Sequence, residues 1–307
     1  MKKDRYFKLN KVTIMSKKKK KKKQNKNLKP TSFRNYQETV SWLKKSVYFI
    51  ARGRKTSKNG KKSTCWISIG TGFLAGDGRM VTAAHVINNP QSQNPLLQHS
   101  DGDLYYLIKH DENNEVHWCI MQNLEFNKSL FVIPNIDLAV LYLNDSFYGD
   151  KKRQYLNRKE DLIPISLKKY PIGTEIGVLG YPLVDLKFED HNIHKPLIGD
   201  ILLRTDKGVI NCRYNTSANE IRYEFTLNFN PGNSGGPIFH TVNGFAISIV
   251  HGFKDVLIEA KETKLPHKAE NYKDDYFINS LSTRYSMGIS TVSMAEVLKK
   301  HGIEIKE

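Results

Sequence analysis

The chain has 307 residues, of which 39% are hydrophobic and 26% charged, and such a composition is typical of a protein with a buried core. Its 20 glycines, its three cysteines and the lack of any apolar run of about 18 residues exclude collagen-like, disulfide-stapled and multi-span membrane proteins. The formal charge of +17 is high enough for a nucleic-acid-binding protein, but +13 of it lies in residues 1–30. The basic character therefore belongs to an N-terminal tail.

This tail contains an unbroken run of lysines over residues 17–23. Adjacent ammonium groups repel one another and bury no apolar surface, so disorder is predicted for residues 1–30. One interpretation is weak contact with nucleic acid or an anionic surface, where each lysine contributes about 1 kcal/mol. The simpler interpretation is a solvated extension. No apolar stretch typical of a secretory signal follows the basic start, and no transmembrane segment is predicted.

The three cysteines, Cys65, Cys119 and Cys212, are odd in number and far apart in the sequence. No Cys-x-x-Cys spacing indicates a zinc site, and no even set indicates a disulfide framework. These features favour a reducing, cytoplasmic compartment, with the thiols acting as small buried hydrophobes. We therefore expect no metal and no cofactor.

Beyond the tail, the pattern of Tyr36, Val40, Trp42 and Leu43 predicts a short amphipathic helix over residues 36–45. Many short apolar or alternating segments then follow with turn residues between them, which favours a β-sandwich or β-barrel over βαβ units. The expected strands cover residues 46–51, 65–74, 79–81, 104–108, 117–121, 130–133, 138–143, 175–179, 198–205, 221–227, 237–239 and 245–251.

Two features near the C-terminus complete the outline. Residues 254–286 are polar and Lys-rich, and they are predicted to form a long insertion between the last strands. Ser293 and Glu296 have the spacing of a capping box, which predicts a terminal helix to about His301.

Three segments carry residue types that together perform one kind of chemistry. They are Thr82-Ala83-Ala84-His85, Ile136-Asp137-Leu138-Ala139-Val140 and Asn230-Pro231-Gly232-Asn233-Ser234-Gly235-Gly236-Pro237. A serine hydroxyl is a poor nucleophile at neutral pH, so an imidazole must take its proton, and a carboxylate must fix the tautomer of that imidazole. Glycines beside the serine let the backbone turn so that amides point at the substrate carbonyl. The predicted oxyanion hole is Gly232, Asn233 and Ser234, with the amides of Gly232 and Ser234 as the donors.

Each of these residues has a structural interpretation when taken alone. His85 could be a satisfied core histidine, Asp137 a cap at the end of a strand, and the glycine-rich segment an ordinary loop. Taken together, in this order, they favour catalysis. A carboxylate within an apolar stretch also costs several kcal/mol unless it is paired.

With these motifs the chain resembles the trypsin-like (chymotrypsin-fold) serine peptidases. The matching stretches are residues 71–73, residues 81–85, residues 137–140, Gly180-Tyr181-Pro182 and residues 231–237. The resemblance implies that His85 is the general base, Asp137 its orienting acid and Ser234 the nucleophile. It also implies an all-β fold of two six-stranded antiparallel barrels with the site in the cleft between them.

On this basis the peptidase domain is expected over residues 31–302. The N-terminal barrel would cover about 45–150 and the C-terminal barrel about 165–292. Asn233 stands where the animal digestive enzymes carry Asp, and the cystines that flank their catalytic histidine are missing. The motif is more similar to the bacterial branch of the family, so activation by N-terminal cleavage is not expected.

The resemblance also locates the primary specificity pocket, whose wall is expected to include Asn228, Val250, His251 and Gly252. No carboxylate stands at Asn228, so the buried negative charge that would select Lys or Arg is absent from that position. An imidazole paired with Asn228 could bind Glu or Gln by hydrogen bonds. Alternatively, His251 is shifted by one place and points into the barrel, and the sequence leaves both arrangements open.

The predicted function is therefore that of a serine endopeptidase acting on a protein or peptide substrate through an acyl-enzyme intermediate. The alternative is a catalytically silent trypsin-like fold that serves as a binding module. Nucleic-acid binding has only the tail in its support and remains an accessory hypothesis.

Overall fold

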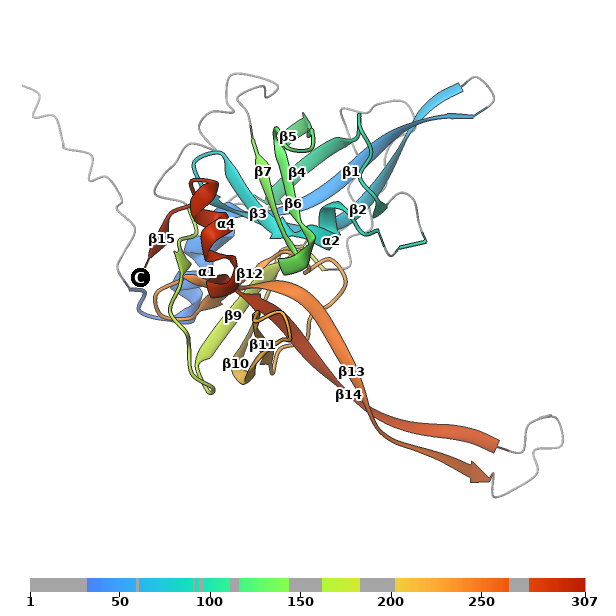
Figure 1. Cartoon of the computed structure of the whole chain (residues 1–307), viewed down its shortest axis with the longest axis vertical. Helices are drawn as coiled ribbons and strands as arrows, with labels where there is room; N and C mark the ends of the chain where they lie inside the picture. The colour runs from blue at the N-terminus through green and yellow to red at the C-terminus, as the bar shows by residue number, and fades with distance from the viewer. Residues whose placement is uncertain are drawn as a thin grey trace, which may run out of the picture.

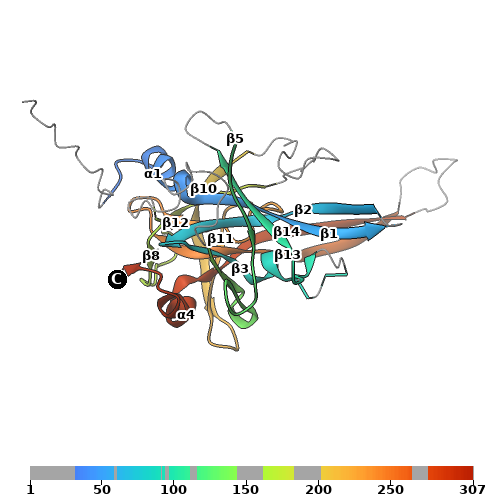
Figure 2. The same cartoon turned by 90° about the horizontal axis from the view of Figure 1, so that it is seen from above.

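The computed structural model of the chain describes residues 32–58, 61–90, 92–93, 97–110, 116–143, 162–182, 202–264 and 276–306. The Lys-rich tail and most of the segment expected between the barrels, about residues 150–165, lie outside this part of the chain. The described residues form two β-sheets with a few short helices around them (Figures 1 and 2). The predicted all-β class is confirmed.

The first sheet has the strand order β5-β4-β1-β2-β3-β7-β6, and all neighbouring strands are antiparallel. Among the described residues it has seven strands where six were expected, because β5 and β6 stand at its two edges beyond β4 and β7. The strands are β1 (Val47–Lys58), β2 (Lys61–Gly76), β3 (Arg79–Ala83), β4 (Leu104–His110), β5 (Val116–Asn123), β6 (Leu130–Ile133) and β7 (Leu138–Tyr142).

The second sheet has the order β12-β9-β10-β11-β14-β13-β8-β15, and an additional pairing of β12 with β13 closes six of these strands into a ring. Strands β8 and β15 extend the sheet beyond β13 by parallel pairings. The strands are β8 (Ile165–Ser166), β9 (Glu175–Gly180), β10 (Arg204–Asn215), β11 (Ile221–Phe225), β12 (Pro237–His240), β13 (Ala246–Lys264), β14 (Tyr276–Ser290) and β15 (Ile305–Lys306).

The alternating pattern of β11 shows how the sequence produces these sheets. Ile221, Tyr223 and Phe225 are buried while the residues between them are half-buried, so one face of the strand points into a barrel core. A separate core cluster joins the two sheets, with Phe49 and Val140 from the first and Phe239 and Ile249 from the second. The two barrels are therefore packed against each other by shared apolar contacts.

The N-terminal helix forms as predicted. Helix α1 (Tyr36–Leu43) begins after Asn35, whose side-chain oxygen accepts a hydrogen bond of 2.9 Å from the backbone N–H of Glu38. The 3-10 turn η1 (Lys44–Ser46) then leads into β1.

The predicted capping box at the C-terminus is wrong, although the helix itself is present. A 3-10 turn, η5 (Thr291–Met294), precedes helix α4 (Ala295–Lys300), and Met294 occupies the cap of α4 without a side-chain hydrogen bond. The Ser293 hydroxyl instead accepts a hydrogen bond of 2.7 Å from the backbone N–H of Ile221. A tertiary contact has therefore replaced the local one.

The polar stretch predicted to be an insertion, residues 254–286, continues the last two long strands. β13 and β14 remain paired from Ser248 and Ser290 to Lys264 and Tyr276. Figure 1 shows this hairpin leaving the body of the molecule as a two-stranded arm. A ribbon that lies outside a barrel need not show the alternation of a half-buried strand, so a polar sequence can be read as a loop. Of the strand predicted at residues 198–205, residues 198–201 lie outside the described part of the chain, and β10 begins at Arg204.

Candidate active site

Strand pairing brings His85 and Asp137 together. His85 lies on the short helix α2 (Ala84–Ile87), directly after β3, and Asp137 directly precedes β7. The β3–β7 pairing places Ala83 opposite Leu138, and the backbone N–H of Ala84 donates to the Asp137 carbonyl at 3.0 Å. The carboxylate of Asp137 therefore lies beside the start of α2.

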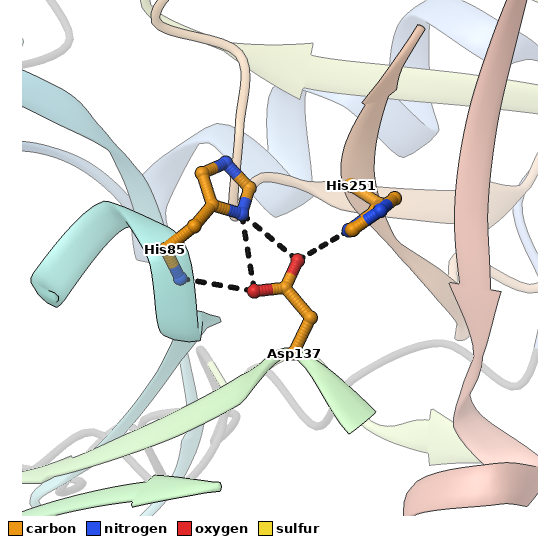
Figure 3. Close-up of side chains that lie close together, drawn as sticks. All are labelled: His85, Asp137 and His251. Atoms are coloured by element: carbon orange, nitrogen blue, oxygen red, sulfur yellow. Dashed lines mark hydrogen bonds and ion pairs between the residues drawn. The ribbon is translucent and has the colours of Figure 1, made fainter. Parts of the chain in front are cut away.

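The Asp137 carboxylate binds His85 at three points (Figure 3). Oδ1 accepts a hydrogen bond of 2.9 Å from the His85 backbone N–H, and His85 Nδ1 lies 2.8 Å from Oδ2 and 3.1 Å from Oδ1. An ionised carboxylate can only accept, so Nδ1 of His85 carries the proton in this contact. In the neutral imidazole, Nε2 then keeps its lone pair.

The surroundings of Asp137 keep its side chain both oriented and ionised. The residue follows the 3-10 turn η3 (Pro134–Ile136) and has left-handed backbone angles, φ 45° and ψ 43°, which Asp adopts more readily than most residues. Burial of the carboxyl opposes its ionisation. The hydrogen bonds and charges of His251 and His85 together outweigh this effect and hold the pKa of Asp137 well below its usual range.

Ser234 lies in a tight turn that is bound to the first sheet. Gly232 and Gly235 have φ of +98° and +83°, which favour glycine. Thr71 of β2 holds the turn twice, because its N–H donates to the Ser234 carbonyl at 2.9 Å and its hydroxyl to the Gly232 carbonyl at 2.7 Å. A Cβ on Gly235 would lie 2.0 Å from Thr82 Oγ1. Only glycine allows the turn to approach β2 and β3 this closely.

Gly70 lies close to both the serine turn and helix α2. A Cβ at Gly70 would lie 2.9 Å from the Ser234 carbonyl oxygen and 2.8 Å from the side chain of Val86, the residue after His85. Among the contacts of the described residues there is no hydrogen bond between the Ser234 hydroxyl and the His85 ring. Such bonds are often long in the absence of substrate and shorten in the reacting complex.

The backbone amides of the turn differ in their availability. The N–H of Asn233 donates to the Asn230 carbonyl at 3.0 Å and is therefore engaged within the turn, and the expected donors were the amides of Gly232 and Ser234. The N–H groups of Gly232 and Ser234 have no hydrogen-bond partner within the described part of the chain. The Asn233 side chain is buried against Gly180, where a Cβ would lie 2.5 Å from its Oδ1.

His251 occupies neither of the two positions left open by the sequence. Its Nδ1 hydrogen-bonds Asp137 Oδ2, and its ring meets that of His85 edge to face at a centroid distance of 5.8 Å (Figure 3). The reason is the register of β13, which two backbone hydrogen bonds to the serine turn determine. The N–H of Gly235 donates to the Val250 carbonyl at 2.9 Å, and the N–H of Val250 donates to the Gly236 carbonyl at 3.0 Å.

The same register places two residues of the expected pocket wall. Val250 packs in the second barrel core, where it is 1% exposed. His251 stands at a register shift of β13, and its ring contacts Asp137. Asn228 is exposed, and a Cβ on Gly252 would have no heavy atom within 4 Å. These two residues remain candidates for the wall.

Sequence reasoning missed two contacts that shape the site. Thr71 stands in a matching motif, but its two hydrogen bonds to the serine turn are tertiary contacts between the sheets. The contact of His251 with Asp137 joins residues 114 positions apart in the sequence. A histidine in place of an apolar residue on β13 was the only local signal for it.

Comparison with known proteins identifies the family. The family model of the trypsin-like peptidase domain matches residues 70–249, a range that includes His85, Asp137 and Ser234. The chain therefore belongs to the trypsin-like peptidase domain family. No curated protein sequence matches the chain. Within the described residues, no helix is both long enough and apolar enough to cross a membrane.

Two solved structures are similar to this chain at low sequence identity. The Rv3671c protease from M. tuberculosis, in its active form, has a TM-score of 0.47 and 16% identity, over 88% of this chain and 85% of that chain. The serine endoprotease from Yersinia pestis has a TM-score of 0.42 and 17% identity, over 86% of this chain and 65% of that chain.

Proposed function

We propose that the chain is a serine-type endopeptidase in which Ser234 is the nucleophile, His85 the general base and acid, and Asp137 the residue that orients His85. The observation that carries this proposal is the bond between the ionised carboxylate of Asp137 and Nδ1 of His85. It fixes the imidazole tautomer that serine catalysis requires.

The reaction follows from this tautomer. The Ser234 hydroxyl attacks the carbonyl carbon of the substrate as Nε2 of His85 takes its proton, and Asp137 stabilises the imidazolium that forms. His85 then gives the proton to the leaving amine, which departs and leaves an ester on Ser234. A water molecule, deprotonated by the same nitrogen, hydrolyses the ester and releases the second product.

The serine turn supplies the second requirement, a site for the negative charge on the carbonyl oxygen. The N–H groups of Gly232 and Ser234 have no partner in the described part of the chain, so both can donate to that oxygen. Loss of one such donor typically lowers the rate about 100- to 1,000-fold. The bonds from Thr71 to the turn keep these amides in position before substrate arrives.

For substrate preference we propose a polar, uncharged pocket near Asn228 and Gly252. No carboxylate stands at either position to select Lys or Arg. With Nδ1 of His251 bound to Asp137, the hydrogen bond proposed between His251 and an acidic or amide substrate loses its main support. Cleavage of matched peptides with Gln, Glu, Leu or Arg before the scissile bond tests this, and a clear preference for Arg would overturn it.

A fluorophosphonate probe and a mixed peptide library test the proposed function directly. The wild type should be labelled at Ser234 and should produce new peptide termini, whereas Ser234→Ala should do neither, with a loss in kcat of about 10⁶-fold. His85→Ala should lose about as much, because members of a triad act as a unit. A well-folded wild type that is neither labelled nor active would favour a binding module.

A further inference from the structure

The second histidine on Asp137 creates a ligand set that a His–Asp pair alone does not provide. One ligand atom each from His85, Asp137 and His251 lies within 4.8 Å of the other two. The three residues come from α2, from the start of β7 and from β13, so both sheets contribute to the cluster (Figure 3). From this cluster we propose that the chain binds a divalent transition-metal ion of the Zn²⁺ type and that the ion switches the peptidase off.

The chemistry of the three ligands fits such an ion. Neutral imidazole and carboxylate are common zinc ligands, and three protein ligands with one water molecule form a standard four-coordinate site. The Asp137 carboxylate lies between the two histidines and hydrogen-bonds the Nδ1 atom of each, so all three ligand atoms face one another. The site was not predicted from the sequence, because the spacing of residues 85, 137 and 251 matches no metal-binding motif.

The geometry requires the distances between ligand atoms to change by up to about 1.4 Å. With metal–ligand bonds of about 2.0–2.1 Å, neighbouring ligand atoms of a tetrahedral site lie about 3.4 Å apart. The 2.8 Å distance between His85 Nδ1 and Asp137 Oδ2 would increase slightly, and ligand atoms that are now more than about 3.4 Å apart would move closer together. The side chains of His85 and His251 are 32% and 28% exposed, so an ion can enter from solvent and can keep a water molecule as its fourth ligand.

Inhibition follows from the nitrogen that the ion occupies, and this part of the inference rests on the proposed function. A metal bond to Nδ1 of His85 uses the electron pair that held the proton, and the proton moves through solvent to Nε2. The imidazole remains neutral, but Nε2 no longer has a lone pair to accept the proton of Ser234. Because the ion lies on the far side of the ring from the serine, kcat should fall while KM stays unchanged.

Metal binding is measured first in the full-length Ser234→Ala protein, so that the result does not depend on turnover. Titration with Co²⁺ should give one equivalent of tetrahedral visible absorption that Zn²⁺ displaces. His251→Gln keeps an N–H that can donate to Asp137 but removes the imidazole ligand. It should weaken binding at least about 100-fold, the upper end of the loss seen when a residue that only supports a metal ligand is removed. His240→Gln removes a half-buried histidine outside the cluster and should bind Co²⁺ like its parent.

Inhibition is then measured in the active chain, with each variant compared to its own metal-free rate. Zn²⁺ should lower kcat of the wild type and of His240→Gln, EDTA should restore it, and His251→Gln should resist inhibition at least about 100-fold better. Equal inhibition of His251→Gln, or a rise in KM alone, would overturn the proposal. So would a Co²⁺ spectrum that His251→Gln leaves unchanged.

The outcomes separate this proposal from the proposed function. Metal binding through the cluster in a chain without peptidase activity would overturn the proposed function and leave the metal site standing. An active peptidase that binds no metal at the cluster would do the opposite. If His251→Gln does not fold, ¹⁵N spectra of the wild-type histidines decide. Zn²⁺ must then shift Nδ1 of His85 and His251, and shifts confined to other histidines would overturn the site.

Discussion

The two sheets contribute to the candidate active site by different physical means. The first sheet provides a pair of side chains, His85 and Asp137, whose mutual hydrogen bonds depend on their chemical identity. The second provides a backbone turn around Ser234, whose position depends on the absence of a side chain at Gly235. Substitutions of His85 or Asp137 should therefore change chemistry with the fold retained, whereas substitutions of the glycines in the turn should change the backbone.

Asp137→Asn tests the first half and has the largest expected effect among the tests of this contrast. Asn also adopts left-handed backbone angles, so the fold should remain, but its amide can leave His85 in the wrong tautomer. We expect kcat to fall about 10⁴-fold with little change in thermal stability. A decrease in melting temperature that accounts for the lost activity would show that this half is structural as well.

Gly235→Ala tests the second half. The added Cβ would lie 2.0 Å from Thr82 Oγ1 and 2.3 Å from the Thr71 carbonyl oxygen, on a backbone with φ of +83°. We expect the free energy of unfolding to fall by about 3 kcal/mol or more, with activity lost as the turn shifts. Gly252→Ala is the matched control for stability, because its Cβ meets no heavy atom within 4 Å. Equal urea midpoints for the two variants would contradict the contrast.

Acid should weaken the first sheet through a second buried carboxylate, Asp103. Burial opposes its ionisation, but the Arg54 guanidinium and the Ser100 backbone N–H donate to it and hold its pKa below the usual range. A lowered pKa stabilises the fold at pH values above the unfolded value of about 3.9, and this contribution is lost as the pH falls further.

Asp103→Asn should make the free energy of unfolding less dependent on pH below about 4 and should lower it at pH 7, where Arg52 and Arg54 lose an ion pair with this carboxylate. Urea unfolding at both pH values measures this. Arg52, which belongs to the same cluster, donates to the Ile87 carbonyl at the end of α2 at 2.7 Å. An unchanged slope in the variant would mean that other carboxylates carry the acid sensitivity.

Deletion of residues 1–30 should have the smallest effect, because the residues named in both halves of the site lie elsewhere in the sequence. Peptide cleavage and unfolding should be unchanged. Binding to a nucleic-acid or anionic-lipid surface should weaken, and its salt dependence should become less steep. Loss of peptidase activity on this deletion would contradict the separation of the tail from the catalytic body.

Sequence could predict those parts of the site that depend on local pattern. His85 and Asp137 stand at the ends of apolar strands that pair directly, so a motif at each strand end was sufficient to propose them. The side-chain direction of His251 depends on the register of β13 against the serine turn, and two backbone hydrogen bonds between distant segments set that register. The Ser293 hydroxyl likewise bonds the backbone N–H of Ile221, a distant residue, and does not cap the helix as its local pattern predicted.

The left-handed backbone at Asp137 also constrains how this position can change in evolution. Most residues are disfavoured at these angles, whereas Asn and Gly adopt them readily. Mutations that remove the carboxylate and keep the fold are therefore concentrated in two residue types. In lineages that have abandoned catalysis but retained the barrels, selection for stability should enrich Asn or Gly at this site, while Ala or Val should be rare.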